Sequence, residues 1–273
     1  MKEEIVKYYP THPLLKRYVN CYTIWKRAAT YTPKQLFLPN NIVGIGFTLS
    51  GKLIINTEKT AITAPAAGTR NVYSKARTME TSGAFYNISV RFKPFGLKAF
   101  TRIDCQPLFE EECLELAHLF GLQQTTEMAE QLQAAHGDRE RVKLLEQFLL
   151  KRYVHHHNNL IEEMVAAIDK QHQVFRIHDL AADFGTSERQ IHRLFHKHIG
   201  ISPKAYISLI RFRQFVQLLN TKKHNAIEAA LESGYFDQSH LIKEFKSFTS
   251  ITPQAFIVKQ QQQTVSDFYN TRP

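Results

Sequence analysis

The chain has 273 residues, of which 43% are hydrophobic, and a formal net charge of +10 at pH 7. This length favours two domains over a single core. The composition excludes a disulfide scaffold, because three cysteines (Cys21, Cys105 and Cys113) cannot all pair and indicate free thiols in a reducing compartment. No apolar run approaches the length of about 18 residues that a membrane span needs, and the charged start MKEEIVKYYP is unlike a secretory signal. We therefore expect a soluble, cytoplasmic protein with no membrane partner.

Residues 1–105 are expected to form a β-rich domain. After an amphipathic, aromatic run at 14–25, the segment LFLPNNIVGIGFTLSGKLIIN (36–56) has β-branched and aromatic stretches, and Ser50-Gly51 within it predicts a hairpin turn. AFYNISVRFK (84–93) alternates polar and apolar residues as a further strand does. The domain should be a small barrel or sandwich with flanking helices.

Residues 106–157 are expected to form a helical connector. Apolar side chains recur at helical spacing in DRERVKLLEQFLLKRYV (138–154). That helix either forms a dimer interface or packs on its own β domain, and the pattern does not separate the two. The polar run at 155–159 marks a linker to the next domain, 158–260, and the polar tail 261–273 should be frayed.

An internal repeat organises the third part of the chain. SERQIHRLFHKHIGISPKAYI (187–207) and DQSHLIKEFKSFTSITPQAFI (237–257) match at a constant offset of 50 residues, with Phe195 opposite Phe245 among the identities. Each copy opens with a residue that caps helices, Ser187 or Asp237. The first helix places an apolar stripe on one side, at Ile191, Leu194, Phe195 and His198.

A short helix that ends at a glycine precedes each copy. These helices are IHDLAADFG (177–185) and AIEAALESG (226–234). A helix, a glycine turn and a second helix with a polar, partly basic outer face form the helix-turn-helix pattern. The second helix of such a unit presents its outer side chains to base edges in the major groove.

With these motifs, residues 158–257 resemble the DNA-binding domain of AraC/XylS-type transcriptional regulators. The landmarks are LAADFGTSERQIHRLFHKHIGISP, Arg211 in the joining helix, and GYFDQSHLIKEF with ITPQAF. The resemblance implies an all-α domain of two helix-turn-helix units joined by a long helix, within an α+β multidomain chain. Ser250 stands where the family has a glycine, which we expect to loosen that turn without abolishing the fold.

A second resemblance covers the end of the β-rich part. NISVRFKPFGLKAF is similar to an N-terminal domain that is often fused to AraC-type DNA-binding domains. It implies a β-barrel that binds a small effector or mediates dimerisation. The residues of an effector site stay unassigned.

The first resemblance, carried over residue by residue, implies two sets of DNA contacts. Base edges are expected to meet Arg189, His192, Arg193, Gln238, Ser239 and Lys243. Arginine can pair bidentately with guanine and glutamine with adenine. Phosphates, which position a protein without carrying sequence, are expected to meet Ser187, His196, Lys197, Lys204 and Lys246. Double-stranded DNA is thus the expected partner, and the resemblance implies RNA polymerase as another.

Net charge alone would place the DNA-binding surface in the N-terminal half of the chain. Residues 1–105 contain 16 basic and 5 acidic side chains, whereas 158–257 contain 12 and 10. Within the latter, acids precede the first recognition helix and Arg189, Arg193 and Lys197 line it. We therefore expect the N-terminal domain not to read DNA sequence. Its surplus of positive charge either faces solvent or selects an anionic effector.

Catalytic and metal sites are not predicted. The sequence shows no nucleophile–base pair and no glycine-rich phosphate loop. Residues 1–117 contain a single histidine, His12, too few for a metal-dependent barrel. His192 and His196 lack a third ligand nearby, so groove-facing or solvated roles suit them better, and the three histidines at 155–157 suit a polar linker better than a metal site. We expect no enzyme, no metal and no cofactor.

Several questions stay open from the sequence alone. The N-terminal half binds either a small effector or another protein, and the chain is either a monomer or a homodimer.

Overall fold

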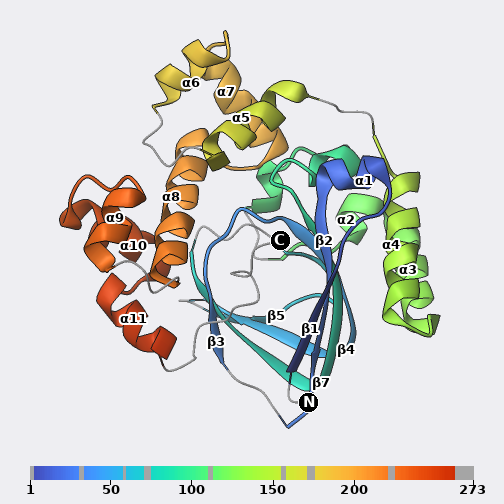
Figure 1. Cartoon of the computed structure of the whole chain (residues 1–273). Helices are drawn as coiled ribbons and strands as arrows, with labels where there is room; N and C mark the ends of the chain where they lie inside the picture. Colours follow the sequence, from blue (N-terminus) through green and yellow to red (C-terminus); the bar gives the residue numbers. More distant parts are fainter. Residues whose placement is uncertain are drawn as a thin grey trace.

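The computed structural model describes residues 3–30, 34–57, 60–70, 75–109, 113–154, 158–170, 176–220 and 225–261. Strands dominate the first part and helices the rest (Figure 1). The strands are β1 (Glu3–Tyr8), β2 (Val19–Arg27), β3 (Gln35–Phe37), β4 (Gly44–Asn56), β5 (Ala61–Thr63), β6 (Ala67–Arg70) and β7 (Arg77–Phe92).

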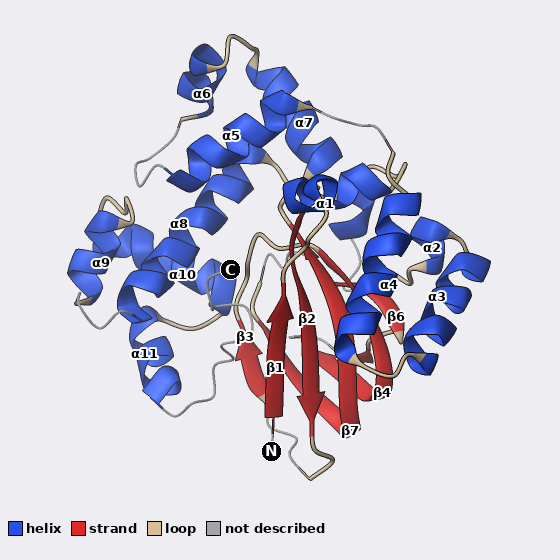
Figure 2. Cartoon of the chain, turned by 45° about the vertical axis from the view of Figure 1, so that its right-hand side comes forward, coloured by secondary structure: helices blue, strands red, loops and turns tan. Residues whose placement is uncertain are grey.

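The described strands form one curved antiparallel sheet in the order β1-β2-β7-β4-β5, with β3 paired to β7 and β6 to β4 (Figure 2). β7 is the centre of this sheet. Its second half pairs with β2 on one side and β4 on the other, and its first residues pair with β3. The β-rich N-terminal half that the sequence predicts is confirmed.

The amphipathic run at 14–25 divides between two elements. Pro13–Tyr18 forms helix α1, whose end is fixed where the chain extends at Val19. From there β2 continues through a β-branched and aromatic stretch in which almost every side chain is buried. A strand buried on both faces shows no alternation, so periodicity could not separate it from the helix before it.

The hairpin predicted at Ser50-Gly51 is wrong. β4 runs through both residues and stays paired with β7, with register shifts on either side of Ser50. Gly51 has φ +70°, and a Cβ there would lie 2.8 Å from the carbonyl oxygen of Ser82. A bulge and a tight turn both use glycine at positive φ, so the local sequence could not tell them apart.

Five short or medium helices of the described chain follow the sheet in sequence. The 3-10 helices η1 (Leu97–Phe100) and η2 (Gln106–Phe109) contact α7 (Glu188–His198). Helices α2 (Ala117–Phe120), α3 (Leu122–Ala134) and α4 (Asp138–Lys151) cover one flank of the sheet, on the side away from the C-terminal part (Figure 2).

The connector helix α4 packs on its own β domain. Asp138 accepts hydrogen bonds from Tyr86 and, at 2.8 Å, from Lys26. The apolar face, with Val142, Leu145, Phe148 and Leu149, is buried within the same chain. The sequence left two interpretations open for this helix. Its apolar face packs within the same chain, and a role in dimerisation stays a prediction.

The C-terminal part is helical and contains two helix-turn-helix units joined by a long helix, as predicted. Its elements are α5 (Asn159–Lys170), α6 (Ile177–Asp183), α7 (Glu188–His198), α8 (Pro203–Asn220), α9 (Ala226–Glu232), α10 (Gln238–Thr249) and α11 (Pro253–Gln261). α8 is the joining helix. The domain limits proposed at 105, 157 and 260 stay predictions.

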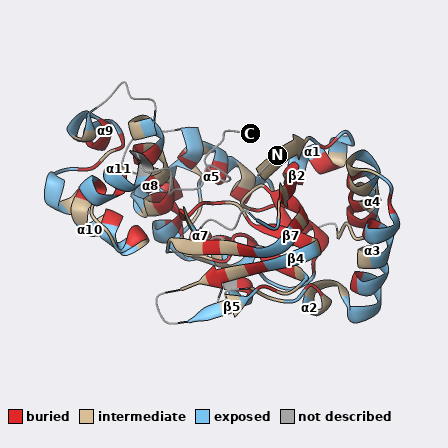
Figure 3. Cartoon of the chain, turned by 90° about the horizontal axis from the view of Figure 1, so that it is seen from below, coloured by how far each residue is buried: buried red, intermediate tan, exposed pale blue. Residues whose placement is uncertain are grey.

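A single apolar cluster connects the sheet and the helices. It contains Tyr22 and Phe92 from the sheet together with Phe195 and Phe212 from α7 and α8, and the buried segments lie along the inner sides of both parts (Figure 3). A second cluster fills the far end of the sheet, around Trp25, Phe37 and Phe85. Apolar burial therefore holds the two parts together.

The predicted free thiols and the membrane-span criterion can be compared with the described residues. The three cysteines are free thiols. Burial raises the pKa of the Cys105 thiol to about 12, which makes it unreactive. None of the helices described combines the length and the apolar character that crossing a membrane requires.

We expect Gly51→Ala to destabilise the β domain more than Gly83→Ala. Both glycines have positive φ, +70° and +75°, so each replacement carries a backbone strain of roughly 1–2 kcal/mol. Only at Gly51 would the new Cβ clash with backbone, adding about 1–3 kcal/mol for overpacking, whereas at Gly83 its nearest neighbour would be 3.7 Å away. Denaturant unfolding measures both variants, and equal losses would show that β7 does not press on Gly51.

Candidate nucleic-acid interface

The first helix-turn-helix unit consists of α6 and α7. The turn between them uses Gly185 at φ +57°, and the Ser187 hydroxyl accepts a hydrogen bond from the backbone N–H of Gln190 at 3.2 Å. The predicted inner stripe is confirmed, since the buried residues of α7 are Ile191, Leu194, Phe195 and His198. The spacing of the buried side chains and the Ser187 cap therefore fix which side chains of α7 face outward.

That outer face is basic. Arg189, Arg193 and Lys197 are exposed and recur every four residues along α7, so their side chains lie on one side of the helix. His192 and His196 are half-buried beside them, with stacked rings 6.4 Å apart. The half-buried position of His196 suits it less well to a phosphate contact than the exposed lysine next to it.

The second unit, α9 and α10, repeats the arrangement with a different outer face. Asp237 caps α10 by accepting from the backbone N–H of His240 at 2.7 Å. The buried residues of α10 are Leu241, Phe245 and Thr249. Among the residues expected to contact DNA, this unit exposes Gln238, Ser239, Lys243 and Lys246.

The turns after the two recognition helices have different residues at the position with positive φ. Gly200 has φ +93°, and Ser250, at the matching position of the second unit, has φ +60°. Ser250 is the only non-glycine residue with positive φ in the described part of the chain. The predicted departure from the family pattern thus retains the same left-handed turn, at a cost of roughly 1–2 kcal/mol.

A polar cluster fixes α10 to the joining helix α8. The Arg211 guanidinium lies 3.5 Å from a Glu244 carboxylate oxygen, which also accepts from the Ser208 hydroxyl at 3.1 Å. His240 lies 3.4 Å from Arg211, and the Tyr235 ring lies below the guanidinium. The sequence identified Arg211 only as a family landmark. Its partners lie about 30 positions away and carry no local signal.

The N-terminal part touches the C-terminal ends of both recognition helices. The backbone N–H of Cys105 donates to the carbonyl of Lys197 at 3.0 Å, and that of Ala76 donates to the carbonyl of Phe248 at 2.6 Å. These bonds satisfy carbonyls that helix ends leave without an intrahelical partner. The position of each recognition helix thus depends directly on the N-terminal domain.

Asp104 places a negative charge beside the first recognition helix. A hydrogen bond from Lys98, at 2.9 Å, together with the nearby Lys197 and His198, holds the pKa of Asp104 below its ordinary value. Asp104, Arg193 and Lys197 line the same hollow.

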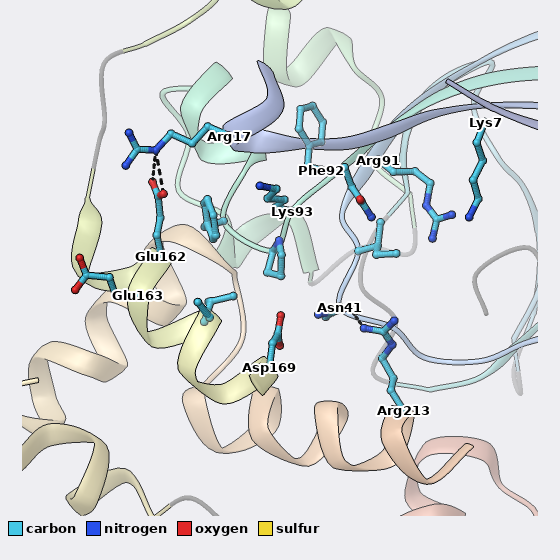
Figure 4. Close-up of a pocket in the computed structure, with 16 residues that line it drawn as sticks. Lys7, Arg17, Asn41, Arg91, Phe92, Lys93, Glu162, Glu163, Asp169 and Arg213 are labelled. Atoms are coloured by element: carbon cyan, nitrogen blue, oxygen red, sulfur yellow. Dashed lines mark hydrogen bonds and ion pairs between the residues drawn. The ribbon is translucent and has the colours of Figure 1, made fainter. Parts of the chain in front are cut away.

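A cavity of about 540 Å³ separates the sheet from α5 and α8 (Figure 4). At its edge the Tyr206 hydroxyl donates to Asp169 at 3.0 Å and accepts from the Asn41 amide at 3.2 Å. Arg213 donates to the side chain of Asn41 as well. Burial and the neighbouring Asp169 raise the pKa of Tyr206 well above its ordinary value, so its proton stays in place.

Metal ligation finds no support among the described residues, where histidine, cysteine and acidic side chains form no group of three. His192 and His196 have no third ligand there. The triple histidine at 155–157 lies outside the described residues.

Comparisons with known proteins cover the chain in two blocks. A family model described as a helix-turn-helix domain matches residues 180–258, and one described as a domain of unknown function (DUF6597) matches residues 7–113. The chain is 27% identical over 93 residues to an uncharacterised HTH-type transcriptional regulator of Haemophilus influenzae, and 30% identical over 86 residues to the HTH-type transcriptional regulator MtrA of Neisseria gonorrhoeae. These matches cover 34% and 32% of this chain but only 31% and 29% of the two relatives.

Two solved structures are also similar. ToxT from Vibrio cholerae aligns with a TM-score of 0.48 at 14% identity, over 87% of this chain and 97% of that one. The DNA-binding domain of AdpA, in complex with a target DNA, aligns with a TM-score of 0.36 at 24% identity, over 39% of this chain and 96% of that one.

The C-terminal part of this chain is therefore a helix-turn-helix domain. This domain has two capped units on one joining helix, and the relatives it matches are named as transcriptional regulators. It is a domain of the AraC/XylS type, as the motifs in 158–257 predict.

We expect Arg211→Gln to lower the free energy of unfolding by about 2–4 kcal/mol, because it leaves the mostly buried Glu244 without its cation. Adding Glu244→Gln should recover part of that loss. Chemical denaturation of the two single variants and the double variant gives the coupling energy. If the single losses simply add, the Arg211–Glu244 pair does not fix α10.

Proposed function

We propose that this chain is a sequence-specific regulator of transcription that binds double-stranded DNA with α7 and α10 in successive major-groove segments. The observation that supports this most is the pairing of two capped recognition helices, each with an exposed polar face, on one joining helix. A domain that presents two such faces at a fixed relative orientation suits two groove segments about one helical turn apart.

Each of the two exposed faces is proposed to contact both bases and phosphates. Arg189 and Arg193 on α7 suit bidentate pairing with guanine, and Gln238 on α10 suits adenine. His192, Ser239 and Lys243 complete the proposed base contacts. Ser187, His196, Lys197, Lys204 and Lys246 are the proposed phosphate contacts, and His196 is the weakest of these because it is half-buried.

Control is proposed to come from the N-terminal part. Its backbone holds the ends of both recognition helices, so a change in its position would move the DNA-reading faces. The interdomain cavity has the volume of a small-molecule site, which commonly ranges from about 300 to 1,000 Å³. This favours a small-molecule effector over the alternative, in which the N-terminal part binds a protein. RNA polymerase and a second copy of the chain stay predicted partners.

DNA affinity should fall steeply with salt, because neutralising a phosphate releases counterions. Each of Lys197, Lys204 and Lys246 should add about −0.9 to the slope of log affinity against log salt concentration, giving about −3 or steeper. Fluorescence anisotropy between roughly 50 and 200 mM salt measures this slope. Lys204→Ala should make it shallower by about one, and a flat response of the native chain would exclude the proposal.

Arg193→Ala should change the sequence preference of DNA binding, whereas Lys246→Ala should change only its affinity. Loss of a bidentate base contact should cost about 1–3 kcal/mol and relax preference at one or two adjacent base pairs. Loss of a phosphate contact should weaken all sequences alike and by less. Selection of sites from random DNA distinguishes the two. If Arg193→Ala kept the consensus of the native chain and lost affinity uniformly, Arg193 would be a phosphate contact.

A further inference from the structure

Among the described side chains of the second helix-turn-helix unit, Phe236 is the most exposed large apolar one, at 72%. It lies between α9 and α10, directly before Asp237, which caps α10. An apolar residue at this position often packs on the fourth residue of the helix, which here is the buried Leu241. The exposure of Phe236 leaves little of its ring for such packing, so core packing does not account for this side chain.

The exposed ring is separate from the other exposed apolar side chains of this unit. Ile227 and Leu231, at 68% and 64% exposure, line a hollow together with Leu241 and Pro253. Among the described residues, the lining of this hollow does not include Phe236. The ring therefore needs an explanation of its own.

The Phe236 ring has a defined position over the first turn of α10. It is stacked on the His240 ring, with centroids 5.7 Å apart and 22° between the planes. His240 is itself held 3.4 Å from Arg211 and meets the Tyr235 ring edge to face. One side of the Phe236 ring is thus supported while most of the ring faces solvent. A side chain that is positioned before its partner arrives loses less conformational freedom on binding.

This position belongs to the end of α10 that is proposed to contact bases. The N-terminal residues of a recognition helix are those that reach base edges in the major groove. Gln238 is the first residue of α10, and Phe236 precedes it by two residues, so their Cα atoms are at most about 7 Å apart. Because successive base pairs lie about 3.4 Å apart, the Phe236 ring can reach a base within about two steps of the one that Gln238 contacts.

The chemistry of the ring selects the group that it can contact there. Gln238, Ser239 and Lys243 offer hydrogen bonds or charge, whereas an aromatic hydrocarbon offers apolar surface. The apolar group that base edges present in the major groove is the C5-methyl of thymine, and phenylalanine is one of the side chains that contact it. Such a contact is favourable because it removes apolar surface of both partners from water. The matching residue of the first unit, 50 positions earlier, is the half-buried Thr186, so the exposed ring distinguishes the second unit.

We propose that Phe236 contacts the C5-methyl group of a thymine in the major-groove segment bound by α10, and that it thereby selects thymine at one position of the site. The inference rests on the proposed function and adds to it an apolar base contact. Gln238 suits adenine, and the arginines of α7 suit guanine. The second unit then selects A·T pairs, whereas the first selects G·C pairs.

The test removes the methyl group from the DNA and the ring from the protein. A site selected from random DNA by the full chain is prepared as duplexes in which one thymine at a time is replaced by deoxyuridine, which lacks only the methyl group. Fluorescence anisotropy measures the affinity of each duplex for the native chain and for Phe236→Ala. For the native chain, one replacement next to the base pairs whose preference Gln238→Ala relaxes should weaken binding about four-fold, the loss for one buried apolar carbon. For Phe236→Ala, the same replacement should have no effect.

Two further variants separate a base contact from a structural role. Phe236→Leu keeps apolar surface at this position and should retain part of the dependence on the methyl group. Leu231→Ala removes a similarly exposed apolar side chain on α9 and should show the methyl dependence of the native chain. Because Phe236 is mostly exposed, its replacement by alanine should leave the thermal midpoint unchanged, so a change in affinity reports on DNA contact and not on folding.

Two results would overturn the proposal. In the first, no single replacement by deoxyuridine weakens binding of the native chain. In the second, the same replacement has an equal effect in Phe236→Ala, which would mean that the ring only covers His240 or contacts the sugar–phosphate backbone. Salt-dependent DNA binding without methyl dependence would refute this inference and leave the proposed function standing, whereas a native chain that selects no DNA site would refute both.

Discussion

The Tyr206 hydroxyl joins three elements that are far apart in sequence. It donates to Asp169 on α5 and accepts from Asn41, in the loop between β3 and β4, while its own residue lies on α8. Tyr206 is fully buried, and a buried hydroxyl without partners would cost about 1–3 kcal/mol. The docking of the DNA-binding domain on the sheet therefore depends on this alignment of three elements.

The same docking reaches the recognition helices. The N-terminal part donates backbone hydrogen bonds to the last turns of α7 and α10, and the apolar cluster runs unbroken beneath them. A rearrangement at the interface would therefore change the positions of both DNA-reading faces together. Small shifts in packed interfaces are converted into discrete changes because such interfaces do not deform continuously. This gives an effector between the domains a physical route to the DNA-binding surface.

The sequence predicted the helical part well because its signals are local. A cap acts within the first turn of a helix, and an apolar stripe repeats every three to four residues, so Ser187 and the Ile191–His198 face could be assigned without knowing their neighbours. The outward direction of Arg189, Arg193 and Lys197 followed from that stripe. Their roles at DNA remain predictions.

What the sequence could not predict depends on contacts between distant residues. Asn41 meets Tyr206, and Arg211 meets Glu244, only through the fold. The continuous β4 was missed because Gly51 has the conformation of a turn while its neighbours remain paired with β7.

Hydroxyl-radical footprinting of the full chain on a site selected from random DNA tests the central claim most directly. If α7 and α10 both read DNA while fixed on α8, two protected segments should lie on one face of the duplex, with centres about one helical turn, or 10–10.5 base pairs, apart. A single protected segment, or two segments on opposite faces, would contradict the account.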